Sequence, residues 1–101
     1  MTTYYLAMAS KKFLLEQEPI EEMLRERTQY YKSNNLPVDF WFIKDLTESK
    51  LPEITQFQKH INKPAAMIIS TNETFINWIK LRVQHVFIES FESTHDLTLY
   101  T

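Results

Sequence analysis

The stretch Pro64-Ala-Ala-Met-Ile-Ile-Ser-Thr-Asn-Glu-Thr-Phe-Ile-Asn-Trp-Ile-Lys-Leu-Arg82 joins a strand pattern directly to a helix pattern. The apolar run Ala65–Ile69 is short, follows a proline and precedes polar residues, which predicts a buried strand. Ser70 stands three residues before Glu73, which is the spacing of a capping box. The pattern therefore predicts a helix that begins at about Thr71.

The expected helix carries an apolar stripe that contains an arginine. Residues recur on this stripe at helical spacing: Phe75, Trp78, Ile79, Arg82 and Val83. In a structural role, the stem of Arg82 packs on the core, and its guanidinium reaches water, the last helix carbonyls or the Trp78 ring. In a functional role, Arg82 anchors a protein interface, because Arg, Trp and Tyr are enriched at interface hot spots. The residues alone leave both roles open.

Length and composition limit the class of protein. The 101 residues fit one domain, expected over residues 1–92, and a polar tail, expected to be flexible, over residues 93–101. No apolar run approaches the roughly 20 residues that cross a bilayer, so we expect a soluble protein. The formal net charge of −2 and the scattered basic residues argue against nucleic-acid binding. With no cysteine, thiol nucleophiles, disulfides and cysteine metal sites are excluded.

The chain contains no glycine. Phosphate-binding loops and dinucleotide fingerprints need glycine where the backbone approaches phosphate, so both are excluded. Left-handed turns must then use other residues that tolerate positive φ, and the candidates are Asn34, Asn35, Asn62 and Asn72.

Three further strands are expected, each from alternation of side chains. Thr2–Ser10 carries apolar side chains on both faces, which predicts a strand that is central or covered on both sides. Val38–Ile43 places Asp39 on the face of Trp41 and Ile43, opposite Phe40. The last strand is expected over Val83–Phe91, with one face formed by His85, Phe87, Glu89 and Phe91, and the other by Val86, Ile88 and Ser90.

Helix patterns separate these strands. Pro19 fits the first turn of a helix that ends near Ser33 or Asn34, with an inward stripe of Ile20, Met23, Leu24, Arg27 and Tyr31. Lys44–Lys50 is expected to be a polar loop, and Pro52 fits the first turn of a short helix whose inward residues are Ile54, Phe57 and Ile61. The order is β-α-β-α-β-α-β, which leaves parallel and antiparallel pairing open.

No catalytic or metal-binding motif is complete. The acidic residues around Pro19 suit the positive end of a helix dipole better than paired catalytic carboxylates. Glu92 and His95 have the Glu-x-x-His spacing of di-iron proteins, but such a site needs two copies of the motif on packed helices. His60 is expected at a helix end. We therefore predict no catalytic residue, no metal site and no cofactor.

Several segments resemble the hypothetical chloroplast reading frame fifty-four family of cyanobacteria, algal plastids and plants. The similarity lies in Met1–Ser10, Phe13–Glu16, Asp39–Trp41 and Pro64–Arg82, and it covers about residues 1–92. Segment Lys44–Asn62 and the tail after Glu92 match least. The resemblance implies an α+β fold: a single four-stranded, antiparallel sheet flanked by about three helices.

The resemblance also implies a function in photosynthesis and chlorophyll biosynthesis. Family members are accessory or assembly factors, not enzymes, of the magnesium-protoporphyrin IX monomethyl ester oxidative cyclase. Their partner is the di-iron catalytic subunit, which is associated with the membrane. A member is then expected in cyanobacterial cytoplasm or plastid stroma, peripheral to the thylakoid membrane through that partner, as a monomer or weak dimer.

The implied partner-binding surface includes Asp39, Phe40 and Arg82, and we add Trp41 and Trp78 as neighbouring candidates. Asp39 has a structural alternative, an ion pair within the fold that could involve Arg82, and Phe40 has one as a core residue. The competing function is a tetrapyrrole carrier or substrate-binding protein, in which aromatic strands line a cavity and His85 approaches the bound magnesium.

Overall fold

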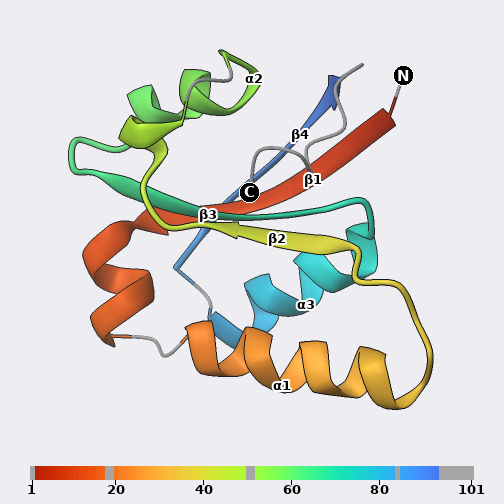
Figure 1. Ribbon diagram of the computed structural model, residues 1–101. Coiled ribbons are helices and arrows are strands. Elements are labelled where there is room, and N and C mark those ends of the chain that lie inside the picture. Colours follow the sequence, from red (N-terminus) through yellow and green to blue (C-terminus); the bar gives the residue numbers. More distant parts are fainter. Residues whose placement is uncertain (1, 18–19, 50–51, 84, 94–101) are drawn as a thin grey trace.

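A four-stranded antiparallel sheet forms the middle layer of the molecule (Figure 1). The computed structural model describes residues 2–17, 20–49, 52–83 and 85–93. The strand order is β2-β3-β1-β4, and each neighbouring pair is antiparallel. The strands are β1 (Thr2–Ser10), β2 (Phe40–Ile43), β3 (Ala65–Ser70) and β4 (Phe87–Ser93). The expected α+β fold with one antiparallel sheet is confirmed.

Helices cover both faces of this sheet. In Figure 1, α1 (Ile20–Ser33) and α3 (Glu73–Val83) lie below it, and α2 (Pro52–Thr55) lies above it. Three short helical segments complete the described structure: η1 (Phe13–Gln17), η2 (Leu46–Glu48) and η3 (Gln56–His60). No helix among the described residues is long and apolar enough to cross a membrane.

The two faces of the sheet bury two separate cores. The α1–α3 side packs on alternate sheet residues, among them Ala7 and Ile68, and the α2 side packs on their neighbours Leu6 and Ile69. This division confirms the prediction that β1 is central and covered on both sides. All six residues of β3 are buried, as its continuous apolar run predicted.

Helix α1 and strand β4 follow their predicted patterns with small shifts at the ends. Ser33 ends α1, and Asn35 then takes a positive φ of 56°, which the chain supplies without glycine. Strand β4 begins at Phe87 rather than Val83, and it includes Ser93, which was expected to begin the tail. Residues 94–101 lie outside the described part of the chain.

The segment between β2 and β3 contains more structure than predicted. The expected loop over residues 44–50 includes η2, whose Leu46 is fully buried. In the short helical region that follows, Ile54 and Phe57 are buried as predicted, and Ile61 packs against the same core. His60 ends η3, also as predicted.

The start of α3 corrects the predicted cap. The helix begins at Glu73, and the Phe75 N–H donates to Asn72 Oδ1 at 3.2 Å, so Asn72 rather than Ser70 is the N-cap. Ser70 is the last residue of β3, and its hydroxyl donates to the Asp39 carbonyl at 2.8 Å. The helix cannot begin before the chain has left the sheet.

Candidate protein-interaction site

Arg27 lies at the centre of a group of aromatic rings from α1 and α3. Its guanidinium carbon Cζ is 4.8 Å from the ring centroid of Phe75 and 5.2 Å from that of Tyr31. The same atom is 5.8 Å from the centroids of both Tyr30 and Trp78. These distances lie within the range of cation–π attraction.

Helical spacing brings these residues together. On α1, Tyr30 and Tyr31 follow Arg27 by three and four residues, so they neighbour it on the helix surface. On α3, Phe75 and Trp78 are three residues apart, and their rings stack with centroids 6.1 Å apart. The arginine thus joins α1 to α3 through ring faces.

Tyr31 connects this group to the start of β2. Its hydroxyl donates to Asp39 Oδ1 at 2.9 Å, and its ring lies edge-on to Phe40 with centroids 5.7 Å apart. Burial raises the pKa of Tyr31 above its usual value of 10.0; the Arg27 guanidinium lowers it, and Asp39 raises it further. At neutral pH, Tyr31 is therefore a protonated donor that fixes the Asp39 carboxylate.

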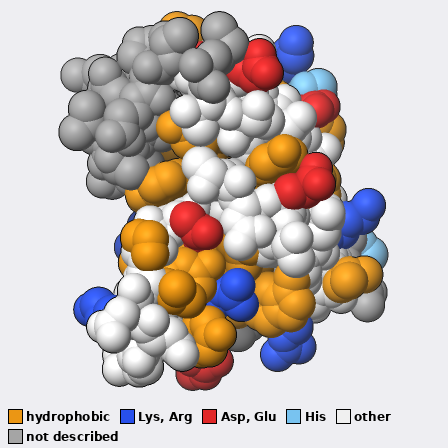
Figure 2. Space-filling model, turned by 90° about the vertical axis from the view of Figure 1, so that its right-hand side faces the viewer, with side chains coloured by type: hydrophobic (Ala, Val, Ile, Leu, Met, Phe, Trp, Pro, Cys, Tyr) orange, Lys and Arg blue, Asp and Glu red, His pale blue; other side chains and the backbone are white. Residues whose placement is uncertain are grey.

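An open pocket of about 290 Å³ lies beside the arginine, and we call it the Arg27 pocket. It is lined by Met23, Glu26, Arg27, Tyr30 and Trp78. Figure 2 shows hydrophobic side chains around a basic side chain in the lower part of the molecule, at the level of α1 and α3. Tyr30 and Trp78 remain 54% and 40% exposed, which is high for large rings.

Only some of the predicted site residues lie near the Arg27 pocket. Trp78 contacts the Arg27 guanidinium directly, and Asp39 is connected to it through its hydrogen bond with Tyr31. Phe40 is 6% exposed and belongs to the core, where its ring is 5.0 Å from that of Phe75. Trp41 packs against the opposite core. Arg82 is exposed on α3 rather than within the buried stripe, which corrects its predicted place.

Two predicted contacts are replaced by others. Between described residues, the cation–π contact of Trp78 is with Arg27 and not with Arg82. Among the described residues Asp39 forms no ion pair with Arg82, and its carboxylate bonds to Tyr31 on the α1 side instead of sharing a face with Trp41. Strand β2 begins only at Phe40, so strand alternation does not apply to Asp39.

Sequence reasoning placed Arg27 on the inward stripe of α1 but missed it as a site residue. The spacing on α1 could have indicated this role, because Tyr30 and Tyr31 follow Arg27 by three and four residues and so lie next to it on the helix surface. The contribution of α3 could not be seen, because it depends on how the two helices pack.

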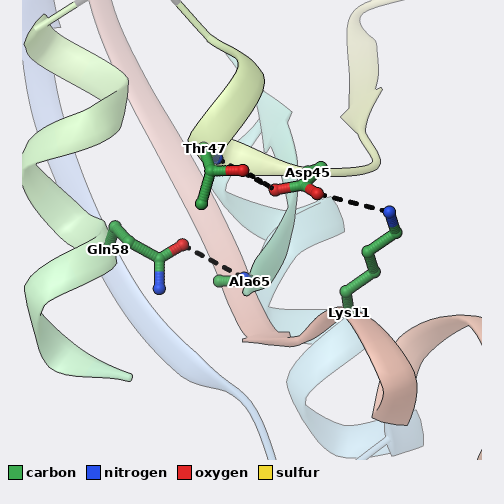
Figure 3. A network of polar contacts seen from close by, with 5 residues as sticks. All are labelled: Lys11, Asp45, Thr47, Gln58 and Ala65. Carbon is green, nitrogen blue, oxygen red and sulfur yellow. Dashed lines mark hydrogen bonds and ion pairs between the residues drawn. The ribbon is translucent and has the colours of Figure 1, made fainter. Parts of the chain in front are cut away.

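A second polar cluster, at the other end of the sheet, is structural (Figure 3). Asp45 Oδ1 accepts from the N–H and hydroxyl of Thr47 at 3.0 and 2.6 Å, and Lys11 Nζ lies 3.3 Å from Asp45 Oδ2. The bonds from Thr47, and to a smaller extent Lys11, lower the pKa of Asp45. Nearby, Gln58 Oε1 accepts from the Ala65 N–H at 3.1 Å. These bonds stabilise the positions of η2 and η3, whose residues Leu46 and Phe57 pack in the core on the α2 side.

Aromatic side chains of the strands pack in both cores, among them Phe40 on the α1–α3 side and Tyr4 on the α2 side. His85 lies elsewhere, on an open pocket of about 390 Å³ with Phe13, Lys12 and Lys63. The His85 and Phe13 ring centroids are 6.4 Å apart. No group of three or more metal-ligand side chains occurs among the described residues.

A family model and several relatives named Ycf54 are similar to this chain. The family model described as Ycf54 protein matches residues 2–93. The ycf54 protein of Pyropia yezoensis is 50% identical over 98 residues, which cover 97% of this chain and 88% of that protein. The Ycf54-like protein of Synechocystis is 42% identical over 96 residues, covering 95% of this chain and 72% of that protein.

A plant relative and solved structures agree with these matches. The chloroplastic YCF54 protein of Arabidopsis thaliana is 39% identical over 95 residues, covering 92% of this chain and 44% of that protein. The structure of Ycf54 from Synechocystis has a TM-score of 0.78 at 39% identity, covering 95% of this chain and 90% of that one. Cyanobacterial and chloroplastic proteins are thus both among the relatives, and this chain belongs to the Ycf54 protein family.

Proposed function

We propose that this chain is a non-catalytic accessory subunit in chlorophyll biosynthesis. It binds and stabilises the catalytic subunit of the magnesium-protoporphyrin IX monomethyl ester oxidative cyclase. It is located in cyanobacterial cytoplasm or plastid stroma and reaches the thylakoid membrane only through that partner. Membership of the Ycf54 family supports this proposal, together with the resemblance of Asp39, Phe40 and Arg82 to the partner-binding residues of that family.

The observation that carries the proposal is the exposed surface of α3 next to the Arg27 pocket. Trp78 lines that pocket, and Leu81, one turn later on the same helix, is 77% exposed. Arg82 follows Trp78 by four residues and is also exposed, so these three side chains neighbour one another on the helix. Trp and Arg are enriched at interface hot spots, and an exposed leucine beside them extends the apolar surface available to a partner.

Co-purification tests this proposal. Tagged wild-type protein is expected to recover the cyclase catalytic subunit, and Arg82→Ala is expected to reduce recovery by about tenfold or more if Arg82 is a hot spot. Lys80→Ala is the matched control, because Lys80 is an exposed cation on the same helix but on another side. Circular dichroism checks that each variant folds. Failure of wild type to recover the subunit would refute the accessory function, and equal recovery by Arg82→Ala would refute the role of Arg82.

A second candidate, a tetrapyrrole carrier, is favoured by the pocket at His85. A histidine there can ligate magnesium, and Lys12 and Lys63 suit the free carboxyl group of the porphyrin monomethyl ester. Titration with the magnesium porphyrin ester decides this case. A saturable absorbance shift that disappears in His85→Ala would favour the carrier, and an unchanged spectrum would exclude it.

A further inference from the structure

The guanidinium of Arg27 has no fixed counter-ion in the part of the chain that the structure describes. Neither of the ion pairs between described residues involves Arg27. Its Nε atom is buried and has no hydrogen-bond acceptor there. No carboxylate of the described residues forms an ion pair with this guanidinium, so a ligand that places negative charge beside it would be favoured.

Two carboxylates near this pocket, those of Asp39 and Glu26, do not form an ion pair with Arg27. Asp39 accepts a hydrogen bond from the Tyr31 hydroxyl, and the Tyr31 ring also contacts the Arg27 guanidinium. Glu26 lines the Arg27 pocket, but successive residues on a helix point about 100° apart, and no ion pair joins it to Arg27. The positive charge of Arg27 therefore remains available at the pocket.

The walls of the pocket determine what else the ligand must carry. Met23, Tyr30 and Trp78 present a thioether and two aromatic rings beside the cation. The rings also hold the guanidinium in place, with centroids 4.8–5.8 Å from Cζ, so little side-chain freedom remains to be lost on binding. A carboxylate attached to an apolar group satisfies both the charge and the walls.

We propose that the Arg27 pocket binds a carboxylate side chain of the partner protein that is flanked by an apolar side chain. This inference rests on the proposed function and names Arg27 as the residue that recognises the partner's acidic residue. An arginine can hold a carboxylate through two parallel hydrogen bonds, which fixes the orientation as well as the position of the bound segment.

The first test uses a small probe and does not require the partner. In NMR titrations, 4-phenylbutyrate supplies a carboxylate and a ring, and 4-phenyl-1-butanol supplies the ring alone. We expect saturable shifts of the Arg27 Nε–H and Trp78 indole signals in the millimolar range with the acid, and much weaker shifts with the alcohol. Equal responses to the two probes, or no response to the acid, would overturn the proposal.

Two variants locate the response. Arg27→Met is expected to abolish the shift of the Trp78 signal, and Arg25→Met is its matched control, an exposed arginine on the same helix. Glu26→Gln is expected to tighten binding of the acid, because it removes a negative charge from the pocket. Loss of the response in Arg25→Met as well, or weaker binding in Glu26→Gln, would contradict the assignment.

Co-purification then separates this inference from the proposed function. If wild type and Arg25→Met recover the catalytic subunit and Arg27→Met weakens its binding on the order of thirtyfold, the inference is supported. Full recovery by Arg27→Met overturns the inference while the accessory function stands. If wild type recovers nothing, the accessory function fails and, with it, the assignment to that partner, while the titration still decides whether the pocket binds carboxylates.

Discussion

Tyr31 joins three parts of the sequence through a single side chain. Its ring packs with Phe40 and lies under the Arg27 guanidinium, and its hydroxyl donates to Asp39. Tyr31 can donate this hydrogen bond only while its hydroxyl keeps the proton, and burial raises the pKa of Tyr31 and so favours that neutral form. The position of Asp39 at the surface therefore depends on the protonation state of a tyrosine.

This dependence predicts a specific alkaline instability. Because the folded pKa of Tyr31 is raised above 10.0, unfolded Tyr31 ionises first, and the folded state loses stability as pH rises between the unfolded and folded values. Tyr31→Phe removes that loss, and at neutral pH it costs about 0.5–1.5 kcal/mol for the hydrogen bond to Asp39. Urea unfolding of both proteins between about pH 8 and pH 11 measures the difference. Parallel pH profiles would contradict the assignment.

At the scale of single residues, sequence patterns predicted the inward face of a helix better than they predicted the contacts and functional roles of its residues. Helical spacing placed Arg27 and Tyr31 inward on α1, and both contribute to the Arg27 group. The same reasoning placed Arg82 in a buried stripe, although it is exposed. Spacing identifies a face of a helix, but how far the neighbouring elements cover that face, here near the end of α3, is a property of tertiary packing.

At the scale of elements, the start of α3 shows how strand and helix compete for the same residues. Ser70 has the right type and spacing for a cap, but its backbone is paired with Tyr5 on one side and Phe40 on the other. Both strand pairings keep it extended, so the helix can begin only after the chain has left the sheet. Asn72 then supplies the cap, and the Ser70 hydroxyl accepts from the Asn72 N–H at 2.9 Å.

This assignment predicts that Asn72→Ala destabilises the protein by about 0.5–2 kcal/mol, the usual cost of losing an N-cap. Hydrogen exchange at the Phe75 amide should accelerate, because that amide donates to the Asn72 side chain. Asn72→Asp is the control that keeps the acceptor, and it should remain close to wild type. An unchanged Phe75 amide in the alanine variant would show that this cap contributes nothing.

At the scale of the whole molecule, the sequence predicted two covered faces but not the pairing of the strands. Alternation of apolar residues in β1 indicated both faces, since Leu6 and Ala7 each need a partner layer. The sequence left parallel and antiparallel strand pairing open, because a helix follows each of the first three strands and such a connection allows either direction. The observed order β2-β3-β1-β4 places the two strands with fully apolar runs, β1 and β3, at the centre, where their two faces can both be buried.

The shared central strands predict that the two cores unfold together. Each core contains one partly exposed tryptophan at its margin: Trp78 stacks on Phe75 of the α1–α3 core, and Trp41 packs on the α2 core. Trp41→Phe and Trp78→Phe therefore leave one fluorescent reporter on each side of the sheet. Since alternate residues of β1 and β3 form both cores, neither core can open without loss of the sheet. We expect each variant's fluorescence transition in urea to coincide with its far-ultraviolet circular dichroism.

A core substitution on one side makes this test decisive. Ile54→Ala removes a fully buried side chain from the α2 core and is expected to cost about 2–5 kcal/mol. If the domain is cooperative, this change lowers the urea midpoint reported by Trp78 on the far side as much as the midpoint reported by Trp41. A shift seen only by Trp41 would mean that α2 and its neighbours form a separate unit that can open while the Arg27 pocket stays folded.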